Sequence, residues 1–488
     1  MTVKWIVLPV LLPMAAGICT ALLPFGSEKA RERFTACAVT LNSLVIAALL
    51  WLHPAGTLTL ITLAGDLPLA LKLDGLGYVF LGLIAFLWPP AVFYSFEYME
   101  HEENLPRFFG FYTMCYGVTA GVALSANLIT MYFFYELLTL VTIPLVAHEG
   151  DRRSMSAGRK YILYSIGGAA ISFAGIMMLY SRAGCSEYVY GGSASAFAGD
   201  SFLLIAYLFT FIGFGVKAAI FPLHGWLPAA SVAPTPVTAL LHAVAVVKSG
   251  VFASIRSTYY AFGPAFLAGT WAQKTAMAVA AFTIVFGSCM ALREQHLKRR
   301  LAYSTVSNLS YILFGMSLMT DGGLVAGLSH MLFHGIMKIT LFFCAGTVLC
   351  KTGREYVPQT VGLGRKMPLT FLTFGIAGLA LTGTPLLPGF VSKMNLLHAA
   401  ADAGGPFAMA GIAALLLSAI LTAAYLLPMT IRAFLVTPED AASFTGRDRD
   451  PGPRMLIPFA VFSAAMLVLG TRAVPLMNAL ERLITGGM

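Results

Sequence analysis

This sequence is poor in charge. Only 11% of its 488 residues are Asp, Glu, Lys or Arg, whereas 58% are hydrophobic. About a quarter of the residues of a soluble domain are charged, so the composition excludes an ordinary water-soluble protein. The apolar residues come in blocks of about twenty, the length that crosses roughly 30 Å of hydrocarbon. We therefore expect an all-α polytopic membrane protein that lies in a lipid bilayer.

The sequence also lacks any cluster of cysteine or histidine. Its seven cysteines are scattered and form no CxxC motif. A disulfide framework, an iron–sulfur cluster and a zinc site are therefore not indicated, and no nucleotide-binding loop is present. We expect no cofactor, no metal and no catalytic redox site in this chain. If it serves an enzyme, we expect it to be the ion-translocating membrane subunit of an oxidoreductase.

The apolar blocks predict fourteen transmembrane helices. They cover residues 3–24, 35–52, 74–96, 108–125, 127–147, 160–181, 201–221, 236–256, 274–292, 301–319, 323–350, 369–402, 409–434 and 455–473. We group them into helices 1–3 (residues 1–107), a first repeat of helices 4–8 (108–256), a second repeat of helices 9–13 (274–434) and helix 14 (455–488).

The positive loop residues predict the orientation. Twenty Lys and Arg residues follow odd-numbered helices, and four follow even-numbered ones: Lys72, Arg182, Arg256 and Lys274. Short cytoplasmic loops are rich in Lys and Arg, so the odd loops should be cytoplasmic and both termini outside a prokaryotic plasma membrane. The net charge of +9 therefore indicates membrane topology. It does not indicate nucleic-acid binding.

Five charged residues remain inside predicted helices. They are Glu136, Lys217, Lys248, Lys338 and Lys393. Each would cost roughly 2.5–3.5 kcal/mol at the bilayer centre if it faced lipid, so we expect all five to face the protein interior or water. All four deep cations are lysines, which lose a proton far more readily than arginine does. The pattern favours proton handling over snorkelling lysines near helix ends.

Histidines form a second element. His330, His334 and Lys338 are spaced i, i+4, i+8, so they line one stripe of a helix. Such a stripe could pass a proton, because imidazole accepts at one nitrogen and donates at the other. Histidines that simply hydrogen-bond to neighbouring helices are an equally good interpretation. His242 and His224 are possible accessory groups.

Two helix breaks form a third element. Pro222 follows Lys217 by five residues, and Pro385 with Gly389 precedes Lys393. Interrupted helices in corresponding places of two halves point to an ion site near the midplane. A repeat of five helices is odd-numbered, so the two repeats should have inverted topology. Unrelated kinks with packing roles are the alternative.

At these motifs the sequence resembles a known superfamily. The motifs are Gly215-Val-Lys217-Ala-Ala-Ile-Phe-Pro222-Leu-His224-Gly-Trp226-Leu-Pro228, Val247-Lys248-Ser-Gly250, Leu297-Lys-Arg-Arg-Leu-Ala-Tyr-Ser304, the stripe His330–His334–Lys338, and Gly383-Thr-Pro385 with Gly389-Phe-Val-Ser-Lys393. They resemble the antiporter-like subunits of respiratory complex I, of Mrp-type Na⁺/H⁺ antiporters and of membrane-bound hydrogenases, including formate hydrogenlyases. The resemblance covers about residues 75–430.

The resemblance implies fourteen helices with two inverted five-helix repeats, and other membrane subunits as partners. It implies a proton pathway through Glu136, Lys217, Lys248, Lys338 and Lys393, in which Glu136 and Lys217 form a gating ion pair. The sequence departs from the family at Ala229, where an acidic residue is common, and at Asn308, where a histidine is common. Either departure could alter a proton entry route.

We therefore expect translocation of H⁺, with Na⁺ as a possible companion, by one member of a larger complex. The alternative is an autonomous secondary transporter of an organic solute that binds at the broken helices. Few polar groups other than the five charged residues lie at membrane depth, and this argues against the alternative.

Overall fold

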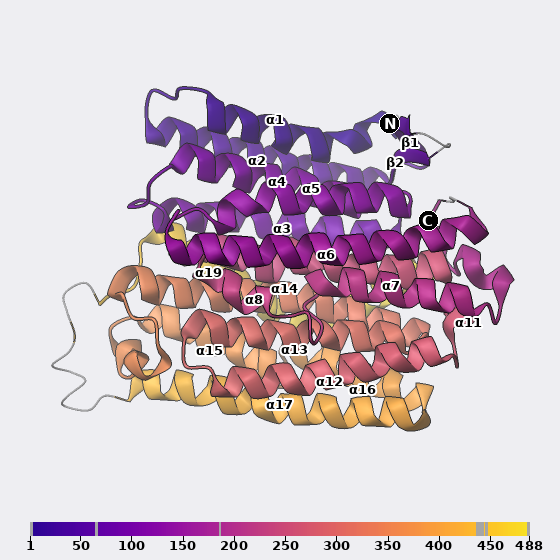
Figure 1. Ribbon diagram of the computed structural model, residues 1–488. Helices are drawn as coiled ribbons and strands as arrows, with labels where there is room; N and C mark the ends of the chain where they lie inside the picture. Colours follow the sequence, from indigo (N-terminus) through magenta and orange to yellow (C-terminus); the bar gives the residue numbers. More distant parts are fainter. Residues whose placement is uncertain (1–2, 64–66, 185–186, 436–443, 445–447, 486–488) are drawn as a thin grey trace.

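The computed structural model describes residues 3–63, 67–184, 187–435, 444 and 448–485. Its helices lie side by side in one bundle, and the two ends of the chain lie at the same end of that bundle (Figure 1). We call this the terminal end and the opposite one the basic end.

The first half of the chain contains a short hairpin and the first broken helix. Its elements are η1 (Val3–Val7), α1 (Leu8–Leu22), α2 (Glu28–Leu52), β1 (Thr57–Leu63), β2 (Leu67–Lys72), α3 (Gly75–Tyr98), α4 (Leu105–Ala123), α5 (Leu128–Val146), α6 (Arg152–Ala183), η2 (Ser193–Phe197), α7 (Ser201–Lys217), α8 (Trp226–Ala229), η3 (Ala230–Val232), α9 (Thr235–Ala239), η4 (Leu240–Val244), α10 (Val246–Arg256) and η5 (Ser257–Phe262).

The second half contains the second broken helix and an additional C-terminal helix. Its elements are α11 (Pro264–Leu267), α12 (Trp271–Arg293), α13 (Leu297–Ser317), α14 (Asp321–Thr352), η6 (Val357–Thr360), η7 (Leu363–Arg365), α15 (Pro368–Thr382), α16 (Pro388–Ala403), α17 (Gly405–Phe434), α19 (Pro453–Thr471) and α20 (Ala473–Thr485).

Every predicted helical range contains helix, and the chain is a predominantly helical, multi-pass membrane protein. Ten helices in the described part of the chain are long and apolar enough to cross a membrane, and α7 and α15 are shorter apolar helices. The count of fourteen spans and the division into two five-helix repeats stay predictions.

Several boundaries differ from the prediction because polar residues cap the helices. α2 begins at Glu28, since the Ser27 hydroxyl accepts a hydrogen bond from the Ala30 amide. α6 begins at Arg152, since Asp151 accepts from the Ser154 amide. Charged residues that the sequence assigned to loops therefore lie in the first turns of helices.

The hairpin β1–β2 was not predicted. Its strands pair in antiparallel register from Thr57 opposite Lys72 to Leu63 opposite Leu67. β2 continues this pairing with the α4–α5 connection, where the Lys72 amide donates to the Leu124 carbonyl at 2.7 Å and the Ala126 amide donates to the Ala70 carbonyl at 3.0 Å. The hairpin thus closes the terminal end over α4 and α5.

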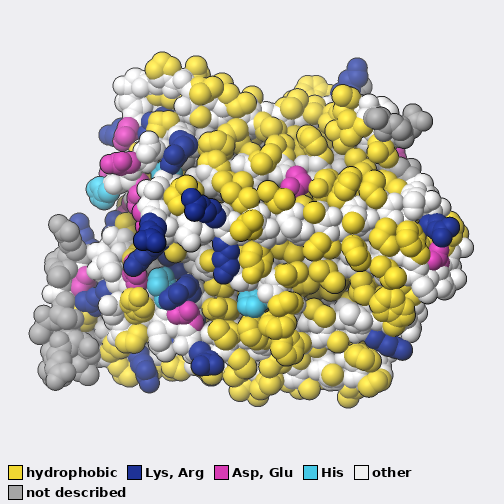
Figure 2. Space-filling model, in the orientation of Figure 1, with side chains coloured by type: hydrophobic (Ala, Val, Ile, Leu, Met, Phe, Trp, Pro, Cys, Tyr) yellow, Lys and Arg dark blue, Asp and Glu magenta, His cyan; other side chains and the backbone are white. Residues whose placement is uncertain are grey.

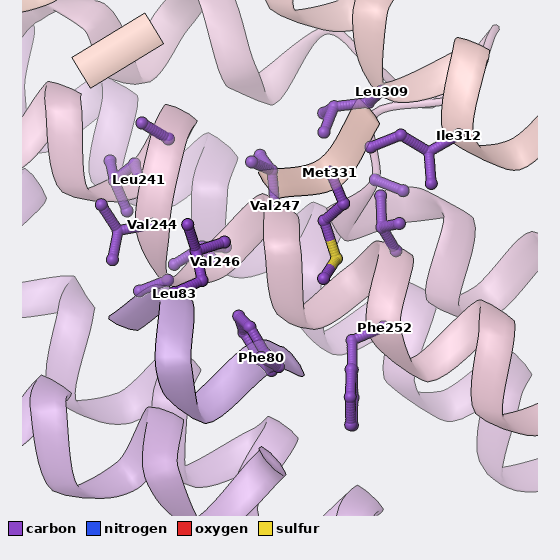
Figure 3. Close-up of a cluster of buried hydrophobic side chains, with 14 of the residues drawn as sticks. Phe80, Leu83, Leu241, Val244, Val246, Val247, Phe252, Leu309, Ile312 and Met331 are labelled. Carbon is purple, nitrogen blue, oxygen red and sulfur yellow. The ribbon is translucent and has the colours of Figure 1, made fainter. Parts of the chain in front are cut away.

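Among the described helices that are long and apolar enough to cross a membrane, α14 and the segment from α9 to η5 are the most buried. The most apolar window of Thr235–Phe262 is buried throughout, and that of α14 is 89% buried. Figure 3 shows apolar side chains from α3, η4, α10, α13 and α14 packed together around Val246 and Val247. Lys248 therefore directly follows two apolar residues of α10 that pack among apolar side chains of neighbouring helices.

Charged side chains gather at one end of the bundle. Figure 2 shows a broad hydrophobic face, with Lys, Arg, Asp, Glu and His concentrated at the end opposite the termini. This distribution agrees with the loop-charge pattern of the sequence, and it defines the basic end.

Candidate functional site

Lys217 is the last residue of α7, four residues earlier than the predicted end of that helix. It is fully buried, and its Nζ donates to the Tyr135 carbonyl of α5 and lies 3.5 Å from the centroid of the Tyr135 ring. A helix C-terminus carries partial negative charge and favours a cation there. The helix break therefore holds the buried lysine at the end of α7, against α5.

Glu136 lies next to this contact but does not pair with Lys217. No salt bridge within 4 Å joins these two described residues, and Glu136 Oε1 is buried without a hydrogen-bond partner. The Glu136 side chain is half-buried in an apolar groove of about 400 Å³ between β1, β2, α5 and α6. In this state of the molecule the predicted ion pair is open.

Lys248 connects the two central helices directly. Its Nζ lies 2.8 Å from Nδ1 of His334 on α14, and both side chains are fully buried. Gly250, two residues further on, lets α10 approach the end of α7, because a Cβ there would lie 2.9 Å from the Cβ of Lys217. No contact within hydrogen-bond distance joins the described side chains of Lys217 and Lys248, so a water or a side-chain movement has to bridge this step.

His334, His330 and Ser392 extend the connection toward α16. The rings of His330 and His334 are 5.9 Å apart between centroids, and His330 Nδ1 lies 2.9 Å from the Ser392 hydroxyl. Tyr311 stacks on His330 at 5.1 Å. Ser392 precedes Lys393, so the line ends at the second helix break.

Lys393 caps the end of α15 from the neighbouring half-helix. Its Nζ donates to the carbonyls of Leu381 at 2.7 Å and Thr382 at 2.9 Å, which the break leaves without helical partners. The lysine lies 5.4 Å from the Tyr311 ring centroid. Lys217 is itself the last residue of the half-helix α7, whereas Lys393 donates to the last carbonyls of the half-helix α15. At both breaks a lysine therefore lies at the C-terminal end of a half-helix.

Lys338 and His242 lie beside this line. Lys338 Nζ donates to the Leu301 carbonyl of α13 at 3.1 Å. His242 is fully buried, and its ring centroid lies 4.7 Å from that of Phe342. The i, i+4, i+8 stripe is therefore real, but its three members contact three different helices.

His224 and the two break prolines lie further out. His224 stacks on Phe221 in the α7–α8 connection, and Pro222 is exposed. The carbonyl of Val216, freed by the break, accepts a hydrogen bond from the Trp226 indole at 2.7 Å. Pro385 lies between α15 and α16. We find no contact between His224 and the central lysines in the described part of the chain.

Arg256 corrects one sequence assignment. The loop-charge count placed it outside the membrane, but it ends α10, is fully buried, and forms a bidentate ion pair with Asp74. Lys298 was also assigned to a loop; it lies in the first turn of α13, buried, and donates to the Ala233 carbonyl at 2.9 Å. The uncharged segment Ser257–Phe262 follows Arg256 and continues the same helical span, and this was the missed signal.

Two cavities open toward opposite ends of the bundle. One of about 410 Å³ at the basic end is lined by residues that include Glu102, Glu149, His296, Lys298 and Glu355. Burial raises the pKa of the Glu149 carboxyl and lowers that of the His296 imidazole, so burial favours the neutral form of both.

The other cavity, of about 740 Å³, lies at the terminal end between α14, α16, α19 and α20. Pro385, Asp321, His398 and Asp402 line it, and the two α16 groups, His398 and Asp402, follow Lys393 by five and nine residues. The described residues contain no group of three His, Cys, Asp or Glu side chains that could hold a metal ion.

Solved structures share this fold. The chain aligns with one chain of the membrane-bound sulfane sulfur reductase, an archaeal respiratory membrane complex, with a TM-score of 0.84 and 24% identity over 98% of this chain and 97% of the other. It aligns with the Mrp complex from Dietzia (TM-score 0.83, 24% identity, 99% of this chain and 52% of the other). The match to respiratory complex I from Thermus thermophilus has a TM-score of 0.82 and 24% identity, and covers 99% of this chain and 100% of the other.

Sequence relatives give the same family. NADH-quinone oxidoreductase subunit N of Desulforudis audaxviator is 32% identical over 413 residues, covering 82% of this chain and 81% of the relative. A component of a probable K(+)/H(+) antiporter of Rhizobium meliloti is 32% identical over 79% of this chain, which spans only 38% of that relative. A putative antiporter subunit mnhA2 of Staphylococcus aureus is 31% identical over 78% of this chain, which spans half of that relative.

Two known protein families match segments that together make up most of the chain. Residues 61–109 match the N-terminus of chain 5 of NADH-ubiquinone oxidoreductase (complex I). Residues 125–422, more than half of the chain and all of the buried line, match the transmembrane family of NADH:quinone oxidoreductase and Mrp antiporters. The chain therefore belongs to the NADH:quinone oxidoreductase/Mrp antiporter transmembrane family.

Proposed function

We propose that this chain moves protons, or exchanges protons for Na⁺, through the buried line of Glu136, Lys217, Lys248, His334, His330 and Lys393. The observation that carries the proposal is the direct contact between Lys248 and His334, continued by His330 and Ser392 to the neighbour of Lys393. It links the two central helices and ends at the second helix break.

The chemistry of the line suits proton transfer. A lysine gives up a proton when its surroundings disfavour charge, and imidazole accepts at one nitrogen while the other donates. His330 Nε2 and His334 Nε2 are buried without partners among the described residues, so each ring has one nitrogen free to take or release a proton. Lys338 and His242 lie near enough to belong to the same titrating group, although they are not in the direct line.

The open arrangement of Glu136 and Lys217 fits a gate. An ion pair between them would hold Lys217 charged, whereas its absence leaves Lys217 on the carbonyl and the ring of Tyr135. Closing and opening this pair would change the proton affinity of Lys217, and with it the step to Lys248. We further propose two inverted repeats, residues 108–256 and 274–434, related through the breaks at Pro222 and Pro385.

The proposal includes partners. The relatives are named as subunits of an NADH-quinone oxidoreductase and of antiporters, so we propose that this chain works with other membrane subunits that supply the driving reaction or the opposing ion. The basic end would face the cytoplasm and both termini the outside, because positive residues are retained on the cytoplasmic side.

Replacing Lys217 or Glu136 by Ala tests the proposal. In vesicles that contain the assembled complex, each variant should lose coupled H⁺ movement, measured by quenching of a pH-sensitive dye, while the subunits still co-purify. The loss should reach about two orders of magnitude for Lys217→Ala, the usual contribution of a proton-transfer group.

Lys274→Ala is the matched control, because Lys274 is exposed near the start of α12. It should leave transport unchanged. Full coupled transport in both Lys217→Ala and Glu136→Ala would refute the proposed relay. Transport of an organic solute by the purified single chain would instead support the autonomous transporter.

A further inference from the structure

Arg256 is a buried arginine that the proposed relay does not use. It lies eight residues after Lys248 on α10, so both side chains extend from the same face, about 12 Å apart along the helix. Arginine stays charged at any physiological pH, so it cannot pass a proton on as lysine does. Its position between Lys248 and the terminal end calls for another role.

A carboxylate and three aromatic rings enclose the Arg256 guanidinium. Asp74 binds it in a bidentate pair, with Nη2 to Oδ1 at 2.6 Å, and the rings of Tyr188, Phe252 and Tyr260 lie 4.8–5.0 Å from its Cζ. Asp74 also caps α3 by accepting from the Gly77 amide at 2.9 Å. The ion pair therefore ties the start of α3 to the end of α10.

Phe252 separates this ion pair from the relay. It lies four residues from both Lys248 and Arg256, and its ring packs on Phe80 of α3 at 4.9 Å (Figure 3). Both phenyl rings are fully buried. Neither can accept or donate a proton, so this layer interrupts any chain of polar groups along the Lys248 face of α10.

The backbone seals the region beyond the ion pair. The Tyr188 amide donates to the Ala126 carbonyl at 2.9 Å, and the Gly191 amide donates to the Tyr259 carbonyl at 3.0 Å, so the α6–α7 connection lies across the end of η5. Gly263, with φ +94°, would place a Cβ 1.8 Å from the Gly191 carbonyl oxygen. The segments touch too closely here for anything larger than glycine.

From this geometry we infer that Phe252, Arg256 and Asp74 form a seal that closes the first half of the chain toward the terminal end. Charge that reaches Lys248 then cannot leave along α10 toward the terminal end, and continues through His334 to α16. The inference rests on the proposed function, since a seal matters only if Lys248 carries protons. We call these three residues the α10 seal.

Asp74→Asn tests the seal in vesicles that contain the assembled complex. Asn caps a helix as well as Asp does, but it removes the charge that balances Arg256, and water should enter to solvate the guanidinium. With no driving reaction running, the decay of an imposed pH gradient should become about tenfold faster, as when the barrier falls by the worth of one charge-assisted hydrogen bond.

Asp200→Asn is the matched control. Asp200 also caps a helix, by accepting from the Phe202 amide at 2.8 Å, and also pairs with an arginine, Arg182, but that pair is exposed. This variant should leave the passive decay unchanged. Phe252→Ala, which removes the aromatic layer and leaves the ion pair in place, is the second test of the seal and should also speed the decay.

The double variant Asp74→Asn/Lys248→Ala separates a seal from a packing defect. If the leak runs through the relay, removing Lys248 should abolish it. A leak that persists without Lys248, or passive decay that stays at the wild-type rate in both Asp74→Asn and Phe252→Ala, would overturn the inference. Coupled transport of Lys217→Ala, measured in the same vesicles, tests the proposed function separately, because that assay depends on the driving reaction and the passive decay does not.

Discussion

The two central helices share a spacing and differ in chemistry. Each presents three large side chains at i, i+4, i+8. They are His330, His334 and Lys338 on α14, and Lys248, Phe252 and Arg256 on α10. On α14 the middle residue is an imidazole that contacts Lys248; on α10 it is a phenyl ring packed on Phe80. From this comparison we infer that the middle residue decides whether such a stripe passes a proton or blocks it.

The largest effect is expected from giving α14 the pattern of α10. His334→Phe removes the group that contacts Lys248 and places an aromatic ring of similar shape at the junction. Coupled H⁺ transport in vesicles should fall by about two orders of magnitude, because the proton-transfer group is lost while the packing is largely kept. Co-purification of the subunits checks that the complex still assembles.

His398→Phe provides the control for that substitution. His398 is an exposed residue of α16 that lines the terminal-end cavity. The same chemical change there should leave most of the transport intact. Equal loss in both variants would mean that transport does not depend on the Lys248–His334 contact.

The reverse exchange should have a smaller effect. Phe252→His gives α10 the pattern of α14 and places a proton acceptor between Lys248 and Arg256. The passive decay of a pH gradient should become about tenfold faster, while coupled transport is reduced only by the leak. Phe252→Leu, which keeps the layer apolar, should show wild-type decay, and an equal leak from both variants would point to altered packing instead.

Much of the fold was readable from the sequence, because blocks of apolar residues of membrane length are a strong signal. All fourteen ranges contain helix, and the breaks near Pro222 and Pro385 were expected. The hairpin β1–β2 was missed although Thr57–Leu63 alternates between polar and apolar residues over its first four positions, a pattern of period two. α2 and α6 begin earlier than predicted, because Ser27 and Asp151, which cap them, lie among charged residues that the prediction assigned to loops.

The sequence could predict which residues belong to the candidate site, but it could not predict the contacts between them. Charge at membrane depth selects Lys217, Lys248 and Lys393 by cost alone. Which helix each of them faces depends on tertiary packing, so the sequence could not reveal that Lys248 contacts His334 or that Lys217 contacts Tyr135 instead of Glu136. Arg256 was missed because an arginine near a predicted helix end is counted as a loop residue.

The smallest expected effect concerns Ser392. This residue connects the α14 stripe to α16, and no described contact connects the α10 stripe to another helix in the same way. Its hydroxyl lies 2.9 Å from Nδ1 of His330 and can relay a proton toward Lys393, the next residue. Ser392→Ala leaves the ring of His330 stacked on Tyr311 but removes its polar neighbour on α16. A hydrogen bond of this kind is worth about 1 kcal/mol, so transport should fall by about fivefold.

Ser392→Thr keeps the hydroxyl and should restore most of the rate. Ser329→Ala is the control: Ser329 is buried on α14 directly before His330, but its hydroxyl donates to the Ala326 carbonyl of its own helix. Wild-type transport in Ser392→Ala would show that protons pass from His330 to Lys393 without this hydroxyl. The connection would then depend on water between α14 and α16. The difference between the α14 and α10 stripes would then depend on His330 and His334 alone.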